Sequence, residues 1–185
     1  MTRSFILGGA RSGKSSYAEQ LAAQSGKEVV YIATGQAYDA EMQQRIEHHQ
    51  QRRPQQWQLV EQPIALAQAI QQWCAPERIV LVDCLTLWLS NLLFAERVDY
   101  PEVGLIEMPP LFIEQRGLFL DSLASLNGDL IIVSNEVGLG VVPFGAVSRC
   151  YVDEAGRLNQ EVAKRCENVV LVTAGLPLVL KGSAA

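Results

Sequence analysis

Short, continuously apolar runs alternate with longer segments of mixed polarity along the 185 residues of this chain. Such runs are typical of strands that are buried on both faces, as in a parallel sheet with helices on either side. Five runs are predicted to be buried strands of this kind: residues 4–7, 29–33, 78–83, 129–134 and 169–173. The alternation of these runs with helical segments predicts an α/β fold.

Helical segments fill the gaps between the predicted strands. They cover residues 14–24, 39–52, 63–74 and 84–93. A further long helix is predicted near the C-terminus, where apolar residues recur every three or four positions: Val147, Tyr151, Ala155, Leu158 and Val162. Residues 176–181 are expected to add an edge strand, because Pro177 lacks the N–H that a central strand would need. Residues 96–112 contain three prolines without a clear period and are predicted to be a loop or insertion, within a single domain over residues 1–185.

The segment GGARSGKS, residues 8–15, matches the phosphate-loop pattern G-x-x-x-x-G-K-[ST], between a predicted strand and a predicted helix. Its glycines let the backbone turn N–H groups toward phosphate oxygens, and the helix that follows adds the positive end of its dipole. Lys14 is expected to reach the β- and γ-phosphates, and the Ser15 hydroxyl to coordinate Mg²⁺. Arg11 is either another phosphate contact or a solvent-facing side chain. The sequence therefore predicts a P-loop nucleotide-binding protein.

Asp83 ends a predicted strand, where a second carboxylate is expected to help hold the metal ion. An alternative role for Asp83 is the N-cap of the helix that follows, and the two roles are compatible. That helix is apolar nearly all round, so it is either buried in the core or makes a contact between subunits.

Charge and cysteine content exclude some classes of protein. A net charge of −5 argues against nucleic acid as the main partner, since binding to a phosphate backbone usually needs a basic surplus. No apolar run reaches the roughly 18 residues of a membrane span, and the first residues lack a signal-peptide pattern, so a cytoplasmic location is expected. The scattered cysteines are expected to be reduced and mostly buried, without a structural zinc site: Cys74, Cys84, Cys150 and Cys166.

The stretch RIEHHQQRRP, residues 45–54, contains both histidines of the chain. In a helix, neighbouring side chains point about 100° apart, so the pair cannot clamp one metal ion. One interpretation is structural, with His49 in the core and His48 solvated. The other is nucleophilic catalysis, in which a neutral imidazole attacks a nucleotide phosphate while Arg52 and Arg53 stabilise the developing charge.

Several blocks of the sequence are similar to a known family. They are GGARSGKS (8–15), YIAT (31–34), DAEMQQRIEHHQQRRPQQW (39–57), VDCLTLWLSNLL (82–93), SNEVGLGVVP (134–143), AGRLNQEVA (155–163) and VTAGLPLVLK (172–181). The blocks with the paired histidines and with NEVGLGVVP are far more specific than the phosphate loop. On these residues the chain resembles the bifunctional adenosylcobinamide kinase and adenosylcobinamide-phosphate guanylyltransferase family of cobalamin biosynthesis.

The resemblance implies a RecA-like sheet, a homotrimer with sites between subunits, and two successive reactions. In the first, ATP or GTP phosphorylates the aminopropanol hydroxyl of adenosylcobinamide. In the second, GTP guanylates a histidine and releases pyrophosphate, and adenosylcobinamide phosphate then takes the GMP to give adenosylcobinamide-GDP. The resemblance places the guanylated histidine at His49, a choice that helix geometry leaves open.

The resemblance also implies which residues contact the nucleotide. Carried over position by position, they are Gly8, Gly9, Ala10, Arg11, Ser12, Gly13, Lys14, Ser15, Ala33, Thr34, Gly35, Gln50, Gln51, Arg52, Arg53, Glu61 and Asp83. The role of Glu61 rests wholly on the resemblance, since by itself it is an ordinary surface carboxylate. Glu136 follows the fourth predicted strand, where ligands gather in open α/β sheets, and is either close to the active site or a turn residue.

Two rival interpretations stay open beside the bifunctional transferase. One is a plain small-molecule kinase whose histidines are structural. The other is a nucleotide-binding regulatory module without turnover. No N-K-x-D motif is present, so any preference for guanine must be established in another way.

Overall fold

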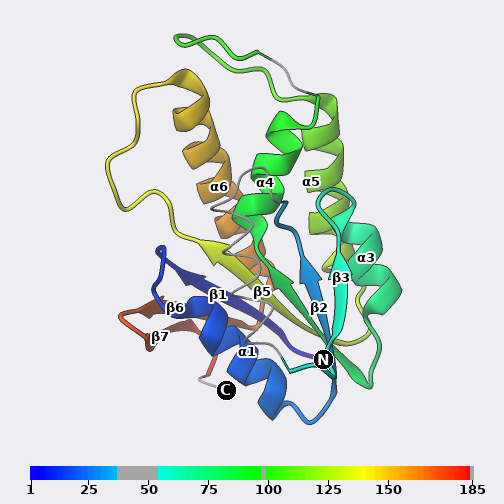
Figure 1. Ribbon diagram of the computed structural model, residues 1–185. Coiled ribbons are helices and arrows are strands. Elements are labelled where there is room, and N and C mark those ends of the chain that lie inside the picture. Colours follow the sequence, from blue (N-terminus) through cyan, green and yellow to red (C-terminus); the bar gives the residue numbers. More distant parts are fainter. Residues whose placement is uncertain (37–53, 97–98, 184–185) are drawn as a thin grey trace.

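The computed structural model describes residues 1–36, 54–96 and 99–183, and a seven-stranded sheet organises them (Figure 1). The strands are β1 (Arg3–Gly8), β2 (Glu28–Ala33), β3 (Gln58–Glu61), β4 (Arg78–Asp83), β5 (Asp129–Asn135), β6 (Asn168–Thr173) and β7 (Leu176–Lys181). Their order in the sheet is β3-β2-β4-β5-β1-β6-β7. All neighbouring strands pair in parallel except β6 and β7, which are antiparallel.

Helices cover both faces of the sheet. They are α1 (Lys14–Gln24), α3 (Leu66–Trp73), α4 (Leu85–Phe94), α5 (Pro110–Ser122) and α6 (Ala146–Arg165). Among the described helices, α1 packs on one face, and α3, α4, α5 and α6 contribute to the core on the other (Figure 1). Successive strand residues point to opposite faces, so Phe5 and Leu7 belong to the larger core while Ile6 packs with α1. The unbroken apolar runs therefore bury both faces of the sheet, as predicted.

The predicted strands agree with the structure to within one residue at their ends. The edge strand at 176–181 is confirmed, with Pro177 opposite Val172 at the border of the sheet. Sequence reasoning missed β3, a four-residue strand on the opposite edge whose side chains are largely exposed. The predicted helix over 63–74 begins three residues later, at Leu66, and the side-chain Oε1 of Gln62 accepts hydrogen bonds from the N–H groups of Ile64 and Ala65 that precede it. The predicted helix over 39–52 lies outside the described residues.

The segment predicted as a loop or insertion, residues 96–112, ends in the first turn of a helix. Pro110 is the first residue of α5, where a missing N–H costs no hydrogen bond. Sequence reasoning did not identify α5, because the prolines masked its start. The helix buries Phe112 and Phe119 against α4.

The apolar helix α4 belongs to the core along most of its length. Trp88 is fully buried, donates its indole N–H to the Ile64 carbonyl oxygen (2.8 Å), and meets Phe119 edge-on with ring centroids 5.1 Å apart. Phe94 at the end of the helix is exposed. Of the two roles considered for α4, the structure supports burial in the core.

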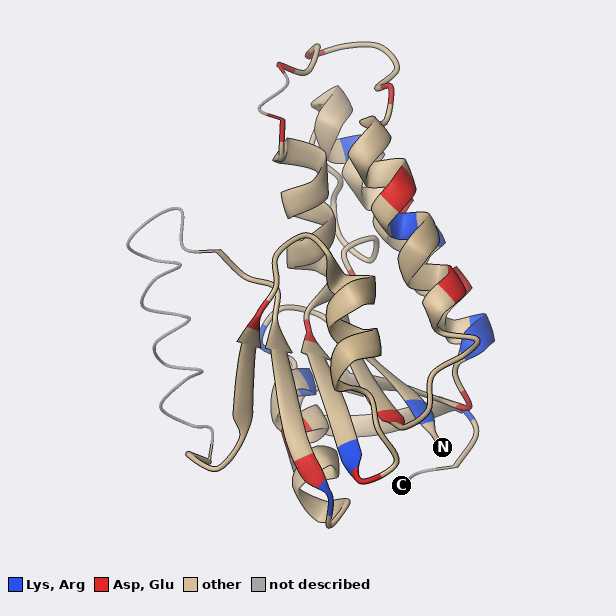
Figure 2. Cartoon of the chain, turned by 90° about the vertical axis from the view of Figure 1, so that its right-hand side faces the viewer, with Lys and Arg blue, Asp and Glu red and all other residues tan. Residues whose placement is uncertain are grey.

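The outer face of α6 is polar, and basic and acidic residues follow one another along its sequence. Figure 2 shows blue and red bands of this kind among the helices that cover the sheet. Glu161 pairs with Lys164 and with Arg165, both at 2.7 Å. These pairs between neighbouring turns stabilise a helix weakly in solvent. The inner face packs Leu158 and Val162 into the core, as the apolar stripe predicted.

All four cysteines lie in the described ranges and are free; Cys84 and Cys166 are buried, and the other two are half-buried. Burial raises the pKa of the Cys166 thiol to about 12, which keeps it protonated at neutral pH. Across the described part of the chain, no helix has both the length and the apolar character needed to cross a membrane.

The packing between α4 and α5 predicts a difference between neighbouring residues of α5. Phe119→Ala leaves a cavity beside Trp88 and is expected to lower the free energy of unfolding by about 3–5 kcal/mol. Leu118→Ala removes a side chain that is 46% exposed and is expected to cost less than about 1 kcal/mol. Urea denaturation measures both values, and equal costs would contradict the packing described for α5.

Candidate nucleotide site

The phosphate loop, residues 8–15, joins β1 to α1 at the carboxyl edge of the sheet. Gly13 has a φ of 96° and Arg11 a φ of 56°, so the chain passes twice through the left-handed region. The N–H of Ser12 donates to the Gly9 carbonyl oxygen at 3.2 Å, which closes a tight turn. Gly13, the N-cap residue of α1, has no side chain to compete with an anion for the N–H groups of the first turn, and the N–H of Lys14 donates to the Ser12 Oγ at 3.4 Å.

Contact with the β6–β7 turn fixes the conformation of the loop. A Cβ atom on Gly8 would lie 2.3 Å from the Ser12 Oγ and 2.6 Å from the carbonyl oxygen of Val172, so only glycine fits there. The N–H of Gly175 donates to the Ser12 carbonyl oxygen at 2.8 Å. A Cβ on Gly13 would come within 3.1 Å of the Gly175 Cα, and its positive φ also favours glycine. The phosphate loop is therefore packed against the end of β6 and against the β6–β7 turn.

Lys14 directs its charge back over the phosphate loop. Its side chain is buried, and its Nζ donates to the Gly9 carbonyl oxygen at 3.2 Å. Within the described residues, the ammonium group makes no ion pair with a carboxylate. An anion bound in the loop would therefore meet a positive charge that no described carboxylate neutralises.

Asp83 ends β4, and its Oδ2 accepts a hydrogen bond from the Tyr31 hydroxyl at 2.9 Å. The helix that follows begins at Leu85 with Cys84 as its N-cap residue and no capping side chain, so the alternative role of Asp83 as an N-cap is wrong. Burial, and next the Asp83 carboxylate, raise the pKa of the Cys84 thiol to about 11, while Lys14 lowers it. The Lys14 ammonium of the phosphate loop and the Asp83 carboxylate at the end of β4 therefore act on the same thiol.

The oxygen donors predicted for a magnesium ion fit that metal in kind. Ser15 offers a half-buried hydroxyl at the start of α1, and Asp83 a half-buried carboxylate. Among the described residues, no group of three or more His, Cys, Asp or Glu side chains gathers to form a complete metal cage. Magnesium in nucleotide sites commonly takes one or two protein oxygens and completes its shell with phosphates and water, which agrees with so small a donor set.

Strand register places the other candidates along the same edge of the sheet. Ala33 lies opposite Asp83 on one side and opposite Glu61 on the other, and Gly8 lies opposite Asn135. Neighbouring strands are about 4.8 Å apart, so Glu61 on β3 is roughly 19 Å from the loop strand β1, four strands away. The structure therefore aligns Glu61 with Ala33 and Asp83 but separates it from the phosphate loop.

Thr34 is fully buried and ties the ends of two strands together. Its hydroxyl donates to the Cys84 carbonyl oxygen (2.7 Å) and accepts from the Cys84 N–H (2.9 Å). The side-chain amide of Asn91 donates to the Thr34 carbonyl oxygen at 2.7 Å. Sequence reasoning missed this supporting role of Asn91, although a lone amide on an apolar helix was the signal. Nucleotide contacts at Thr34 and at its half-buried neighbours Ala33 and Gly35 stay predictions.

The candidate nucleophile lies outside the described residues. The same holds for the other histidine and for four of the residues predicted to contact GTP. They are His48, His49, Gln50, Gln51, Arg52 and Arg53.

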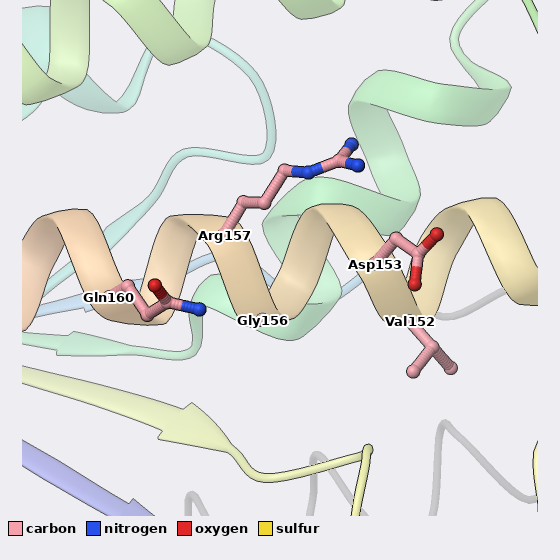
Figure 3. Close-up of a pocket in the computed structure, with 5 residues that line it drawn as sticks. All are labelled: Val152, Asp153, Gly156, Arg157 and Gln160. Atoms are coloured by element: carbon pink, nitrogen blue, oxygen red, sulfur yellow. The ribbon is translucent and has the colours of Figure 1, made fainter.

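A shallow hollow of about 300 Å³ lies elsewhere, along α6 (Figure 3). Its lining residues are Val152, Asp153, Gly156, Arg157 and Gln160, none of which is a predicted site residue. The close-up shows Arg157 and Val152 projecting in opposite directions from the helix. The hollow is thus an open groove on one helix, whereas the phosphate loop contacts the β6–β7 turn and the residue that follows β5.

The parallel sheet, the glycine-lined loop and the buried lysine define a P-loop nucleotide-binding protein. A prototypical ATPase from the type III secretion system of pathogenic bacteria is 14% identical and superimposes with a TM-score of 0.57, covering 96% of this chain and 56% of that one. The ATPase EscN from the type III secretion system of enteropathogenic E. coli is also 14% identical and superimposes with a TM-score of 0.57, covering 94% of this chain and 43% of that one. At this identity the likeness concerns the fold alone, and it confirms the predicted P-loop NTPase fold.

The sequence assigns the chain more narrowly. Residues 4–180 match the family described as cobinamide kinase / cobinamide phosphate guanyltransferase. The chain is 52% identical to the bifunctional adenosylcobalamin biosynthesis protein CobP of Pseudomonas aeruginosa, over 97% of this chain and 98% of that protein. It is 38% identical to the bifunctional adenosylcobalamin biosynthesis protein CobU of Escherichia coli, over 95% of this chain and 98% of that protein. The chain therefore belongs to the cobinamide kinase and cobinamide phosphate guanyltransferase family, which confirms both the resemblance and the expectation of an enzyme.

The packing of the phosphate loop predicts unequal effects of methyl groups on adjacent glycines. Gly8→Ala must displace the backbone at Val172, and we expect it to lower the free energy of unfolding by about 1–3 kcal/mol. A Cβ on Gly9 meets nothing within 4 Å, so Gly9→Ala is expected to change stability by less than about 1 kcal/mol. Thermal or urea unfolding without nucleotide compares the two, and a Gly8→Ala protein as stable as Gly9→Ala would contradict this geometry.

Proposed function

We propose that this chain is a bifunctional enzyme of adenosylcobalamin biosynthesis. It phosphorylates adenosylcobinamide with ATP or GTP. It then transfers GMP from GTP, through a guanylyl group held on His49, to give adenosylcobinamide-GDP. The observation that carries the proposal is an intact phosphate loop whose buried Lys14 directs its ammonium group to the Gly9 carbonyl oxygen, in a chain that belongs to this family from residue 4 to residue 180.

The phosphate loop binds the triphosphate in both reactions. The backbone N–H groups of residues 8–15 surround the phosphates, and the Lys14 ammonium neutralises the β- and γ-phosphates. Ser15 and Asp83 hold Mg²⁺, which when bound neutralises further phosphate charge. Ala33, Thr34, Gly35 and Glu61 contact parts of GTP that lie farther along the edge of the sheet, which agrees with the four-strand distance between Glu61 and the loop.

Guanylyl transfer needs a nucleophile at the α-phosphate. A neutral imidazole nitrogen of His49 forms the new N–P bond, the bond between the α-phosphorus and its β-bridging oxygen breaks, and pyrophosphate leaves. An oxygen of cobinamide phosphate then attacks the same phosphorus and displaces the imidazole. Arg52 and Arg53 stabilise the charge on the phosphoryl oxygens, and Gln50 and Gln51 contact GTP beside them.

We propose the assembly from the family resemblance, and the location and the absence of a nucleic-acid partner from the sequence patterns and net charge. One domain over residues 1–185 carries both reactions, and three copies form a homotrimer in which neighbouring subunits complete each site. The protein acts in the cytoplasm on small-molecule substrates and has no nucleic-acid partner.

The proposed nucleophile predicts opposite results for the two adjacent histidines. Incubation with GTP labelled at the α-phosphate is expected to leave an acid-labile, alkali-stable covalent label, as a phosphoramidate requires. His49→Ala should remove this label and the transfer of GMP, whereas His48→Ala should keep both. Normal labelling of the His49→Ala protein would show that the nucleophile lies elsewhere.

A single phosphate cradle predicts that one lysine serves both reactions. Lys14→Ala is expected to lower the rates of kinase turnover and of guanylylation by about 100-fold or more, because both transition states lose the same charge. Lys164→Ala, on the exposed face of α6, is the matched control and should leave both rates unchanged. Full kinase turnover by Lys14→Ala would refute a shared site.

A further inference from the structure

The strand β5 brings a third carboxylate to the nucleotide edge. It lies between the loop strand β1 and the strand β4 that carries Asp83. Glu136 is the first residue after β5, and its backbone N–H donates to the Gly8 carbonyl oxygen at 3.1 Å. The connection from β5 to α6 therefore leaves the sheet directly beside the phosphate loop.

Sheet order ranks the three edge carboxylates by distance from the loop. With strands about 4.8 Å apart, β5 is about 5 Å from β1, β4 about 10 Å and β3 about 19 Å. Glu136 thus starts closest to the loop, Asp83 lies one strand farther away, and Glu61 is the most distant. Asp83 is already held by the Tyr31 hydroxyl and assigned to the metal, so Glu136 is the nearby carboxylate without a role.

The Glu136 carboxylate is positioned but not neutralised. It is half-buried, and its Oε1 accepts the Gly138 N–H at 2.9 Å. It forms no ion pair with any residue in the described ranges. The preceding residue, Asn135, is fixed by a hydrogen bond from its side-chain amide to the Thr86 hydroxyl (2.6 Å). A rigid strand end thus carries a carboxylate that has lone pairs left to accept a proton.

The rest of this connection is apolar and open to solvent in the described chain. Leu139 is 83% exposed, Val141 99% and Phe144 81%. Cobinamide is a large macrocycle that combines an apolar, methyl-bearing ring with polar amide side chains, and exposed apolar residues would pack against the ring better than they suit water. The exposed apolar residues therefore favour binding of the acceptor substrate on the side of the phosphate loop where Glu136 lies.

We propose that Glu136 is the general base of the kinase step, an inference that rests on the proposed function. The acceptor hydroxyl gives its proton to the Glu136 carboxylate as its oxygen bonds to the γ-phosphorus. The bond between the γ-phosphorus and its β-bridging oxygen breaks, and the nucleoside diphosphate leaves with the electron pair. The carboxylic acid then returns the proton to solvent. Guanylyl transfer has no use for this base, because its nucleophiles are an imidazole lone pair and an ionised phosphate.

Glu136→Gln should therefore separate the two reactions. With ATP and adenosylcobinamide, kcat for phosphorylation is expected to fall by about 100-fold or more. With GTP and adenosylcobinamide phosphate prepared by the wild-type enzyme, the rate of GMP transfer should stay within about twofold. Glu114→Gln, which changes an exposed carboxylate of α5 in the same way, should leave both rates unchanged.

The conservative variant distinguishes a base from a structural carboxylate. Glu136→Asp keeps a proton acceptor and should recover about tenfold or more of the kcat that Glu136→Gln loses, while KM for adenosylcobinamide stays unchanged in both. The inference is overturned if Glu136→Gln phosphorylates within about threefold of wild type, or loses both reactions to the same degree. Failure of the proposed function is a separate result, since the wild-type protein itself would then not transfer GMP.

Discussion

The nucleotide site depends on the absence of a side chain at Gly8, where the phosphate loop turns against the carbonyl oxygen of Val172. This close approach joins the loop that follows β1 to the end of β6, and the hydrogen bond from Gly175 to Ser12 holds the other side of the turn. Because the loop is tied to the sheet, strand register determines which strand-end residues lie near a bound phosphate. Each strand that ends at this edge places its last residues at a fixed lateral distance from the loop strand β1.

The carboxyl edge is also where the two apolar layers end. Elsewhere the five inner strands are covered on both faces, and their polar groups must find partners inside the protein. Thr34 and Asn135 meet that requirement with hydrogen bonds to Cys84 and Thr86, and they stiffen the strand ends. Lys14 and Glu136 make no ion pairs within the described ranges, so their charges remain available to substrates. The edge therefore combines rigid supports with uncompensated charge, an arrangement suited to phosphoryl transfer.

The buried strands and the phosphate loop could be predicted because unbroken apolar runs and the G-x-x-x-x-G-K-S spacing are local signals. The strand β3 could not, since a short edge strand with exposed side chains has no such pattern. The start of α5 was hidden because Pro110 indicates a loop as readily as a first helical turn. The burial of Thr34 depends on contacts with Cys84, 50 positions away, which no local pattern records. The choice of His49 over His48 came from family resemblance and not from geometry.

The central claim is that one triphosphate cradle serves a kinase and a histidine-based guanylyl transfer. Its most direct test is mass spectrometry of the peptide containing residues 46–52 after incubation of the protein with GTP and Mg²⁺. The account predicts that this peptide gains the mass of one GMP, that fragmentation places it on His49, and that adding adenosylcobinamide phosphate removes it. An unmodified peptide in a preparation that still forms adenosylcobinamide-GDP would contradict the covalent route.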